Sequence, residues 1–209
     1  MGSVKVKVGY FLEDVGQERF LTSLVERVAQ EKHFGKIEHE VRNATGGRGR
    51  VLSELRKFLR ELGQSPLDLD LLVVAIDGNC KSYQKVRKEI HKMVQRSRCH
   101  IPVVCAIPDP HIERWYLADE EALKQVLNIQ SVSSLPPYKC ERGRYKRALR
   151  QTVRNAGIIP PLGGIEYGAD IANTLDFYKV GKVDAGFKHF IDDLRTLLSN
   201  LKHSPSSGK

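Results

Sequence analysis

Three apolar runs along the chain each end in an acidic residue. They are residues 8–12 followed by Glu13, residues 71–76 followed by Asp77, and residues 103–108 followed by Asp109. Continuous apolar runs rich in β-branched residues are typical of strands buried on both faces of a parallel sheet. A weaker segment, 37–41, alternates apolar and charged residues and predicts an edge strand.

Helical periodicity fills the intervals between these predicted strands. Apolar faces predict helices after Asp14, over 51–62, over 81–95 and, briefly, around 113–117. The resulting β-α-β-α-β-α-β-α order, with right-handed crossovers, predicts an α/β domain with a mostly parallel four-stranded sheet over residues 1–130.

The pattern becomes purely helical beyond Pro136 and Pro137. Helices are predicted over about 142–156 and along an apolar face that runs from Phe187 to Leu201. We expect residues 131–202 to form a helical C-terminal addition packed on the sheet domain. The Ser/Pro/Gly-rich tail, 203–209, is expected to be disordered.

Composition excludes several classes of protein. The 209 residues suffice for one well-cored domain, and no apolar stretch approaches the ~18 residues that span a bilayer. The N-terminal residues lack the apolar core of a signal peptide. The four cysteines lack metal-ligand spacing, and four thiols in a chain of this size indicate a reducing compartment. We therefore expect a cytoplasmic protein without a membrane partner.

The acidic residues at the ends of the apolar runs predict a cation site. In an open parallel sheet, residues just past the strands gather along one edge, where such folds bind ligands. Glu13, Asp77 and Asp109 at that edge, in a chain of net charge +9, suggest a hard divalent cation such as Mg²⁺ or Mn²⁺. The alternative is that each acid only caps the helix that follows it.

Basic residues are concentrated in two segments. Residues 81–98 and residues 139–154 each carry seven Lys or Arg against one Glu, so the rest of the chain is slightly acidic. Basic stripes on helices suit a nucleic-acid backbone. The alternative is that each stripe is a solvent-exposed helix face kept basic for solubility. This would be the preferred interpretation if only one of the two stripes were present. The candidate nucleic-acid-binding residues are Arg48, Lys81, Lys85, Arg142, Lys146 and Arg150.

Several motifs resemble a known family. Glu13 followed by residues 17–20 resembles the opening of Toprim domains, and Asp77-Gly78-Asn79 resembles their paired-acid motif, with Asn in place of the second acid. The chain is most similar to a Toprim-related family of short bacterial proteins, from Val4 to about Leu198. The further matching segments are the Gly-rich turn at 47–52, the Glu-x-Trp motif within 111–119, and the closing elements 167–172 and 185–191.

The resemblance implies a Toprim fold that binds Mg²⁺ and acts on nucleic-acid phosphodiesters, as in the OLD-type nucleases. It also implies an ATPase partner protein, since such proteins often stand beside ATPases in anti-phage or toxin-like systems. The matched site residues are Glu13, Asp77, Asn79 and Glu113. Two departures matter: Asn79 weakens the acidic pair, and Asp14 replaces the glycine that usually follows the first Glu.

Phosphodiester cleavage needs charge stabilisation at the phosphoryl group and an activated water, which Mg²⁺ supplies. Because Mg²⁺ is held by only one or two carboxylates, Glu13 and Asp77 suffice for its first ligands. Glu113 or Asp109 would hold a second ion or orient the water, and Glu13 is alternatively a general acid or base. The candidate metal ligands are Glu13, Asp77, Asn79 and Asp109, and the candidate catalytic residues are Glu13, Asp77 and Glu113.

Two classes of function remain open from the sequence. The first is a Mg²⁺-dependent nuclease, an effector of phage defence or a toxin system. The second is a non-catalytic subunit that binds nucleic acid or a partner protein through a degenerate site, which the Asn79 substitution favours. The choice between DNA and RNA stays open, because backbone contacts carry no sequence information.

Overall fold

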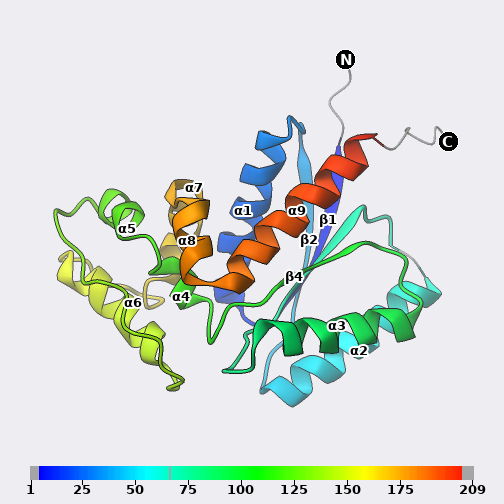
Figure 1. Cartoon of the computed structure of the whole chain (residues 1–209), viewed down its shortest axis with the longest axis horizontal. Helices are drawn as coiled ribbons and strands as arrows, with labels where there is room; N and C mark the ends of the chain where they lie inside the picture. Colours follow the sequence, from blue (N-terminus) through cyan, green and yellow to red (C-terminus); the bar gives the residue numbers. More distant parts are fainter. Residues whose placement is uncertain (1–4, 66, 204–209) are drawn as a thin grey trace.

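The computed structural model describes residues 5–65 and 67–203 and confirms the α/β fold class (Figure 1). Four strands form one sheet in the order β2-β1-β3-β4, and every neighbouring pair is parallel. The strands are β1 (Val6–Leu12), β2 (Ile37–Asn43), β3 (Leu71–Ala75) and β4 (Val103–Ala106). The alternating segment is an edge strand, as predicted, and the layout agrees with the Toprim-like one that was expected.

Strand register aligns the carboxyl ends of the sheet. Leu12, the last residue of β1, pairs with Asn43 of β2 and with Ala75 of β3. Ala75 in turn pairs with Ala106 of β4. All four strands therefore end in one row, and the residues that follow them start from a common edge.

Two helical layers cover the sheet. Alternate strand residues point to opposite faces, so Val73 packs into one core cluster and Val74 into the other. Helices α1 (Glu18–Glu31) and α9 (Ala185–His203) cover the first face, and α2 (Arg48–Gln64) and α3 (Tyr83–Ser97) cover the second (Figure 1). The aromatic and aliphatic faces of these helices match the predicted apolar periodicity.

The C-terminal helices pack on the sheet domain and share its core. Phe187 and Phe190 of α9 lie against Trp115, with ring centroids 5.1 and 6.1 Å apart. Gly186 makes this approach possible, because a Cβ there would lie 2.2 Å from the carbonyl oxygen of Ile107, the residue after β4. Helix α9 is thus one layer of the sheet domain, while the predicted boundary at residue 130 stays a prediction.

Shorter helices surround the carboxyl edge of the sheet. They are α4 (Glu113–Tyr116), α5 (Glu120–Leu127), α6 (Arg144–Asn155), α7 (Gly168–Thr174) and α8 (Phe177–Val183), with 3₁₀ turns at Val15–Gln17 and Ile165–Tyr167. Helix α6 begins after Gly143, whose φ of 71° leaves Arg142 just outside the helix. Of the tail expected to be disordered, His203 ends α9 and residues 204–209 lie outside the described chain. None of the helices described is long and apolar enough to cross a bilayer.

Candidate functional site

Glu13 and Asp77 meet at the carboxyl edge of the sheet. The Glu13 carboxylate accepts a hydrogen bond of 2.8 Å from the backbone N–H of Asp77, while its own N–H donates to Ala75 O at 3.1 Å. Burial, and then the charge of Asp77, raises the pKa of Glu13 from 4.5 to about 7. The two acids that the sequence placed at one edge are therefore brought together, as predicted.

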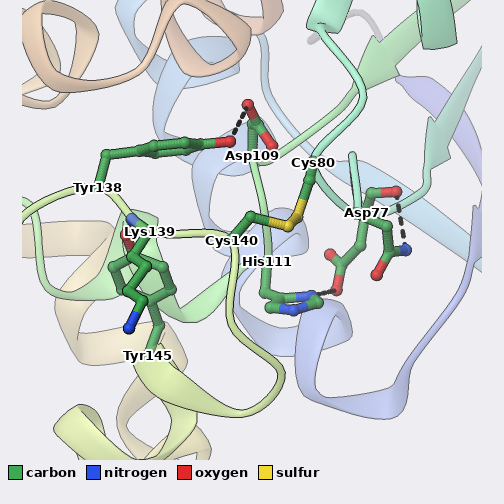
Figure 2. Close-up of a disulfide and its surroundings, with 9 residues drawn as sticks. Asp77, Cys80, Asp109, His111, Tyr138, Lys139, Cys140 and Tyr145 are labelled. Atoms are coloured by element: carbon green, nitrogen blue, oxygen red, sulfur yellow. Dashed lines mark hydrogen bonds and ion pairs between the residues drawn. A yellow bond between two sulfur atoms is a disulfide. The ribbon is translucent and has the colours of Figure 1, made fainter.

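Asp77 has a partner on each carboxylate oxygen. Its Oδ1 accepts from the Gln17 side-chain amide at 3.0 Å, and its Oδ2 lies 3.0 Å from His111 Nδ1 (Figure 2). Burial raises the pKa of Asp77 to about 6, and the contact with His111 opposes that rise. The same contact raises the pKa of His111. Asp77 is thus held in a fixed orientation at the edge.

Gln17 is a site residue that sequence reasoning missed. Fully buried, it accepts from the Glu13 N–H at 3.1 Å and donates to Asp77, so one amide bridges both acids. Its spacing from Asp14 indicates a helix cap, which explains why its second role escaped notice. A polar residue one turn after the first acid is the signal that would have found it.

Glu113 lies at the same edge, at the start of α4. Burial raises its pKa, and its charge in turn raises the pKa of Asp77. Lys146 of α6 is close enough to lower the pKa of Glu113, and Asp14 raises it. The site therefore gathers four acids and one histidine, with a lysine from a predicted basic stripe beside them.

Asp109 is oriented away from this group. Its Oδ2 accepts from the Tyr138 hydroxyl at 3.1 Å, and Figure 2 shows its carboxylate pointing away from Asp77. Its N–H donates to Asp184 at 3.3 Å, a contact from the C-terminal part of the chain. Asn79 adjoins Asp77, but its side-chain amide donates to Asp77 O at 3.2 Å within its own turn. Metal ligation by either residue stays a prediction, and the placement of Asp109 does not favour it.

Cys80 and Cys140 form a disulfide beside the site (Figure 2). The expectation of four free thiols was therefore wrong. Only two of the four cysteines, Cys99 and Cys105, are free thiols in the described chain. Sequence spacing gave no indication, because the pairing depends on a turn after β3 meeting the segment before α6. The bond joins the starts of the two basic segments, with 5.7 Å between the two Cα atoms.

The predicted phosphate-binding residues differ in their solvent exposure and in whether they already form ion pairs. Arg48 is 17 % exposed and already donates to Asp77 O and to Glu89, so it supports the turn after β3. The other five are exposed and form no ion pair within the described chain; they are Lys81, Lys85, Arg142, Lys146 and Arg150. These cations stand on segments that the disulfide brings together at the acidic edge.

The two carboxylates of Glu13 and Asp77 are suitable oxygen ligands for a hard divalent cation. Among residues 5–65 and 67–203, no three His, Cys, Asp or Glu side chains form a ready metal cluster. Burial raises the pKa of both Glu13 and Asp77, and a cation bound between them would favour their charged forms. Mg²⁺ keeps several waters and needs only one or two carboxylates, so this pair is chemically suited to hold it.

The family model described as "domain of unknown function (DUF4276)" matches residues 12–195. The chain belongs to the DUF4276 family. No curated protein and no solved structure matches it. The matched range of this DUF4276 protein contains the whole acidic edge, the disulfide and both basic segments, so the site lies within the family's own domain.

The raised pKa values make the metal-free DUF4276 protein less stable as pH rises. The folded chain holds protons on Glu13 and Asp77 that the unfolded chain loses above about pH 4, so stability falls as pH rises through about 7. Glu13→Gln keeps an acceptor for the Asp77 N–H without the charge. With EDTA present, it should raise the free energy of unfolding at pH 8 by about 1–3 kcal/mol and leave it unchanged at pH 4.

Urea denaturation at the two pH values measures this difference. Glu40→Gln, which removes an exposed acid from β2, is the matched control and should have no effect at either pH. An equal gain for Glu13→Gln at both pH values would show that its charge is not the cause.

Proposed function

We propose that the protein is a Mg²⁺-dependent nuclease that cleaves DNA or RNA phosphodiesters at the carboxyl edge of its sheet. The observation that carries the proposal is the junction of two basic segments at a partly buried acidic pair. Lysines and arginines on both sides attract the phosphate backbone, which the acids alone would repel. A cation between acids and phosphate reconciles the two charges.

Each residue of the candidate site has a distinct role in this proposal. Glu13 and Asp77 would hold the cation. Gln17 and His111 orient the Asp77 carboxylate, and the Asp77 N–H orients that of Glu13. When bound, Mg²⁺ supplies charge stabilisation at the phosphoryl group and an activated water. Glu113, whose pKa burial raises, exchanges a proton with the water or the leaving oxygen. Lys146, beside Glu113, binds a phosphate oxygen.

The proposal also includes a role for the protein in the cell. By resemblance we propose an effector of anti-phage defence or of a toxin system, working with an ATPase partner protein. The sequence composition leads us to place it in the cytoplasm. Cytosolic disulfides are commonly transient, so the Cys80–Cys140 bond would be reversible there.

One observation favours a second function, a nucleic-acid-binding subunit without catalysis. Both oxygens of the Asp77 carboxylate already have partners, Gln17 and His111. Together with Asn79 in place of an acid, this leaves fewer free oxygen ligands for a cation. The two functions differ in whether the cation binds and whether the phosphodiester is cut.

Asp77→Ala separates the two functions. It should lower cleavage of DNA or RNA by about 100-fold or more with Mg²⁺ or Mn²⁺, because it removes a metal ligand. Binding in EDTA should be preserved, because the basic residues remain. Asp68→Ala, which removes an exposed acid before β3, is the control and should cut normally.

Two results would contradict the proposal. Wild type that binds but never cuts, with either cation and its genomic neighbour supplied, would leave the binding-subunit function. Wild type that neither binds nor cuts would exclude both.

The basic segments predict a steep salt dependence of binding. Replacing Arg142, Lys146 and Arg150 with Ala should reduce the slope of log K against log salt on duplex DNA by about 2–3, through fewer released counterions. The loss of affinity should be similar for every sequence. Fluorescence anisotropy over a salt series measures the slope.

The matched control removes three lysines near the opposite, amino end of the sheet. Lys5 precedes β1, Lys36 precedes β2, and Lys202 donates to Lys32 O after α1. Their replacement with Ala changes net charge equally and should leave the slope nearly unaltered. Equal slopes for the two triple variants would show that net charge, not this edge, drives binding.

A further inference from the structure

Tyr138 is an exposed aromatic residue that is nevertheless fixed in place. Half of its surface, 52 %, is exposed to solvent. Its hydroxyl donates to Asp109 at 3.1 Å (Figure 2). The Arg114 guanidinium lies 5.4 Å from its ring centroid. An exposed tyrosine held at its tip and over its ring loses little freedom when a ligand stacks on it.

The chain around Tyr138 is fixed as well. The Tyr145 hydroxyl accepts from the Lys139 N–H at 3.2 Å and donates to Pro137 O at 3.5 Å. Two residues after Tyr138, the Cys140 disulfide joins the segment to the turn that carries Asp77 (Figure 2). With the disulfide formed, the ring therefore has a set position relative to the acidic edge.

A pocket of about 300 Å³ adjoins the ring. Its wall is formed by Ser82, Gln84, Asp109, Arg114, Tyr138 and Asp184, among others. Ser82 and Gln84 in this wall are exposed, so a hydroxyl and an amide, each with a donor and an acceptor, are open to a ligand. An aromatic ring beside an acceptor and a donor matches a nucleobase, which has a flat π face and both kinds of group on its edge.

We propose that Tyr138 and this pocket bind an unpaired nucleobase of the strand whose phosphate lies at the acidic edge. The inference rests on the proposed function and names its substrate class. A base inside a duplex is stacked on its neighbours and cannot stack on a protein ring. The substrate is therefore single-stranded nucleic acid, or a site where a duplex is locally unpaired.

The position of the pocket supports this geometry. It is lined by the start of α3, where the first basic segment begins, and by Tyr138, just before the second. A strand whose phosphates follow both segments passes this pocket on its way across the acidic edge. Base stacking and phosphate binding then act on neighbouring parts of one nucleotide chain.

The test uses single-stranded oligonucleotides that carry 2-aminopurine, bound in EDTA so that nothing is cut. Tyr138→Ala should weaken single-strand binding about tenfold, as expected for one lost base stack, and should restore the fluorescence that stacking quenches. Tyr138→Phe keeps the ring and should stay within about threefold of wild type. Affinity for a fully paired duplex should be the same in all three proteins.

Tyr178→Ala is the matched control. Tyr178 is 70 % exposed and also carries a cation over its ring, Lys182 at 4.3 Å, but it lies on α8 outside the pocket. Its loss should change neither affinity nor fluorescence. Equal melting temperatures of wild type and Tyr138→Ala would show that the fold is intact.

Two further comparisons distinguish a nucleic-acid strand from a free mononucleotide as the ligand, and failure of the base pocket from failure of the proposed nuclease. A free mononucleotide should bind about 100-fold more weakly than the strand, because it lacks the phosphates along both basic segments. Equal affinity would overturn the strand as the ligand. Unchanged single-strand binding and fluorescence in Tyr138→Ala would overturn the base pocket and leave the proposed nuclease standing. No binding of any nucleic acid would overturn both.

Discussion

The parallel pairing of β1 with β3 fixes everything else at the site. Because Leu12 lies opposite Ala75, the residues that follow the two strands leave the sheet side by side. The Glu13 carboxylate can then accept from the Asp77 N–H at 2.8 Å. A shift of the register by two residues would move one acid about 7 Å along the sheet and separate the pair.

Partial burial of two adjacent acids, Glu13 and Asp77, opposes folding, and the surrounding structure offsets part of that cost. The Gln17 amide bonds to both sides of the pair, and His111 and Arg48 contact Asp77. The disulfide adds a covalent constraint between the turn after Asp77 and the segment before α6. These supports keep the acids together without a cation, and a cation would complete the charge balance.

The sequence was most informative where local pattern decides the structure. Strands buried on both faces of a parallel sheet need continuous apolar residues, so β1, β3 and β4 could be predicted from their apolar runs. The alternation of apolar and charged residues predicted β2 as an edge strand. The Glu13–Asp77 pair followed from strand direction alone. Helix α9 was predicted as a helix, but its place as a layer of the sheet depends on a long-range contact at Gly186.

Contacts between distant segments account for what was missed. Asp109 follows β4 as predicted, yet its carboxylate points away from Asp77 and accepts from the Tyr138 hydroxyl. Asp184, still farther along the chain, accepts from the Asp109 N–H. The disulfide depends on the same C-terminal segment returning to the turn after β3. The spacing of Gln17 from Asp14 indicates only a local capping role and gives no sign of its contact with Asp77. None of these partners is visible in a window of neighbouring residues.

The central claim is that the Glu13–Asp77 pair holds a divalent cation. Crystals soaked in Mn²⁺ and measured at its absorption edge test it directly, because anomalous scattering locates the ion without an activity assay. We expect one peak bonded to carboxylate oxygens of both residues, with the His111 contact to Asp77 lengthened or reoriented. No peak at saturating Mn²⁺, or a peak elsewhere with Asp77 still paired to His111, would contradict the account.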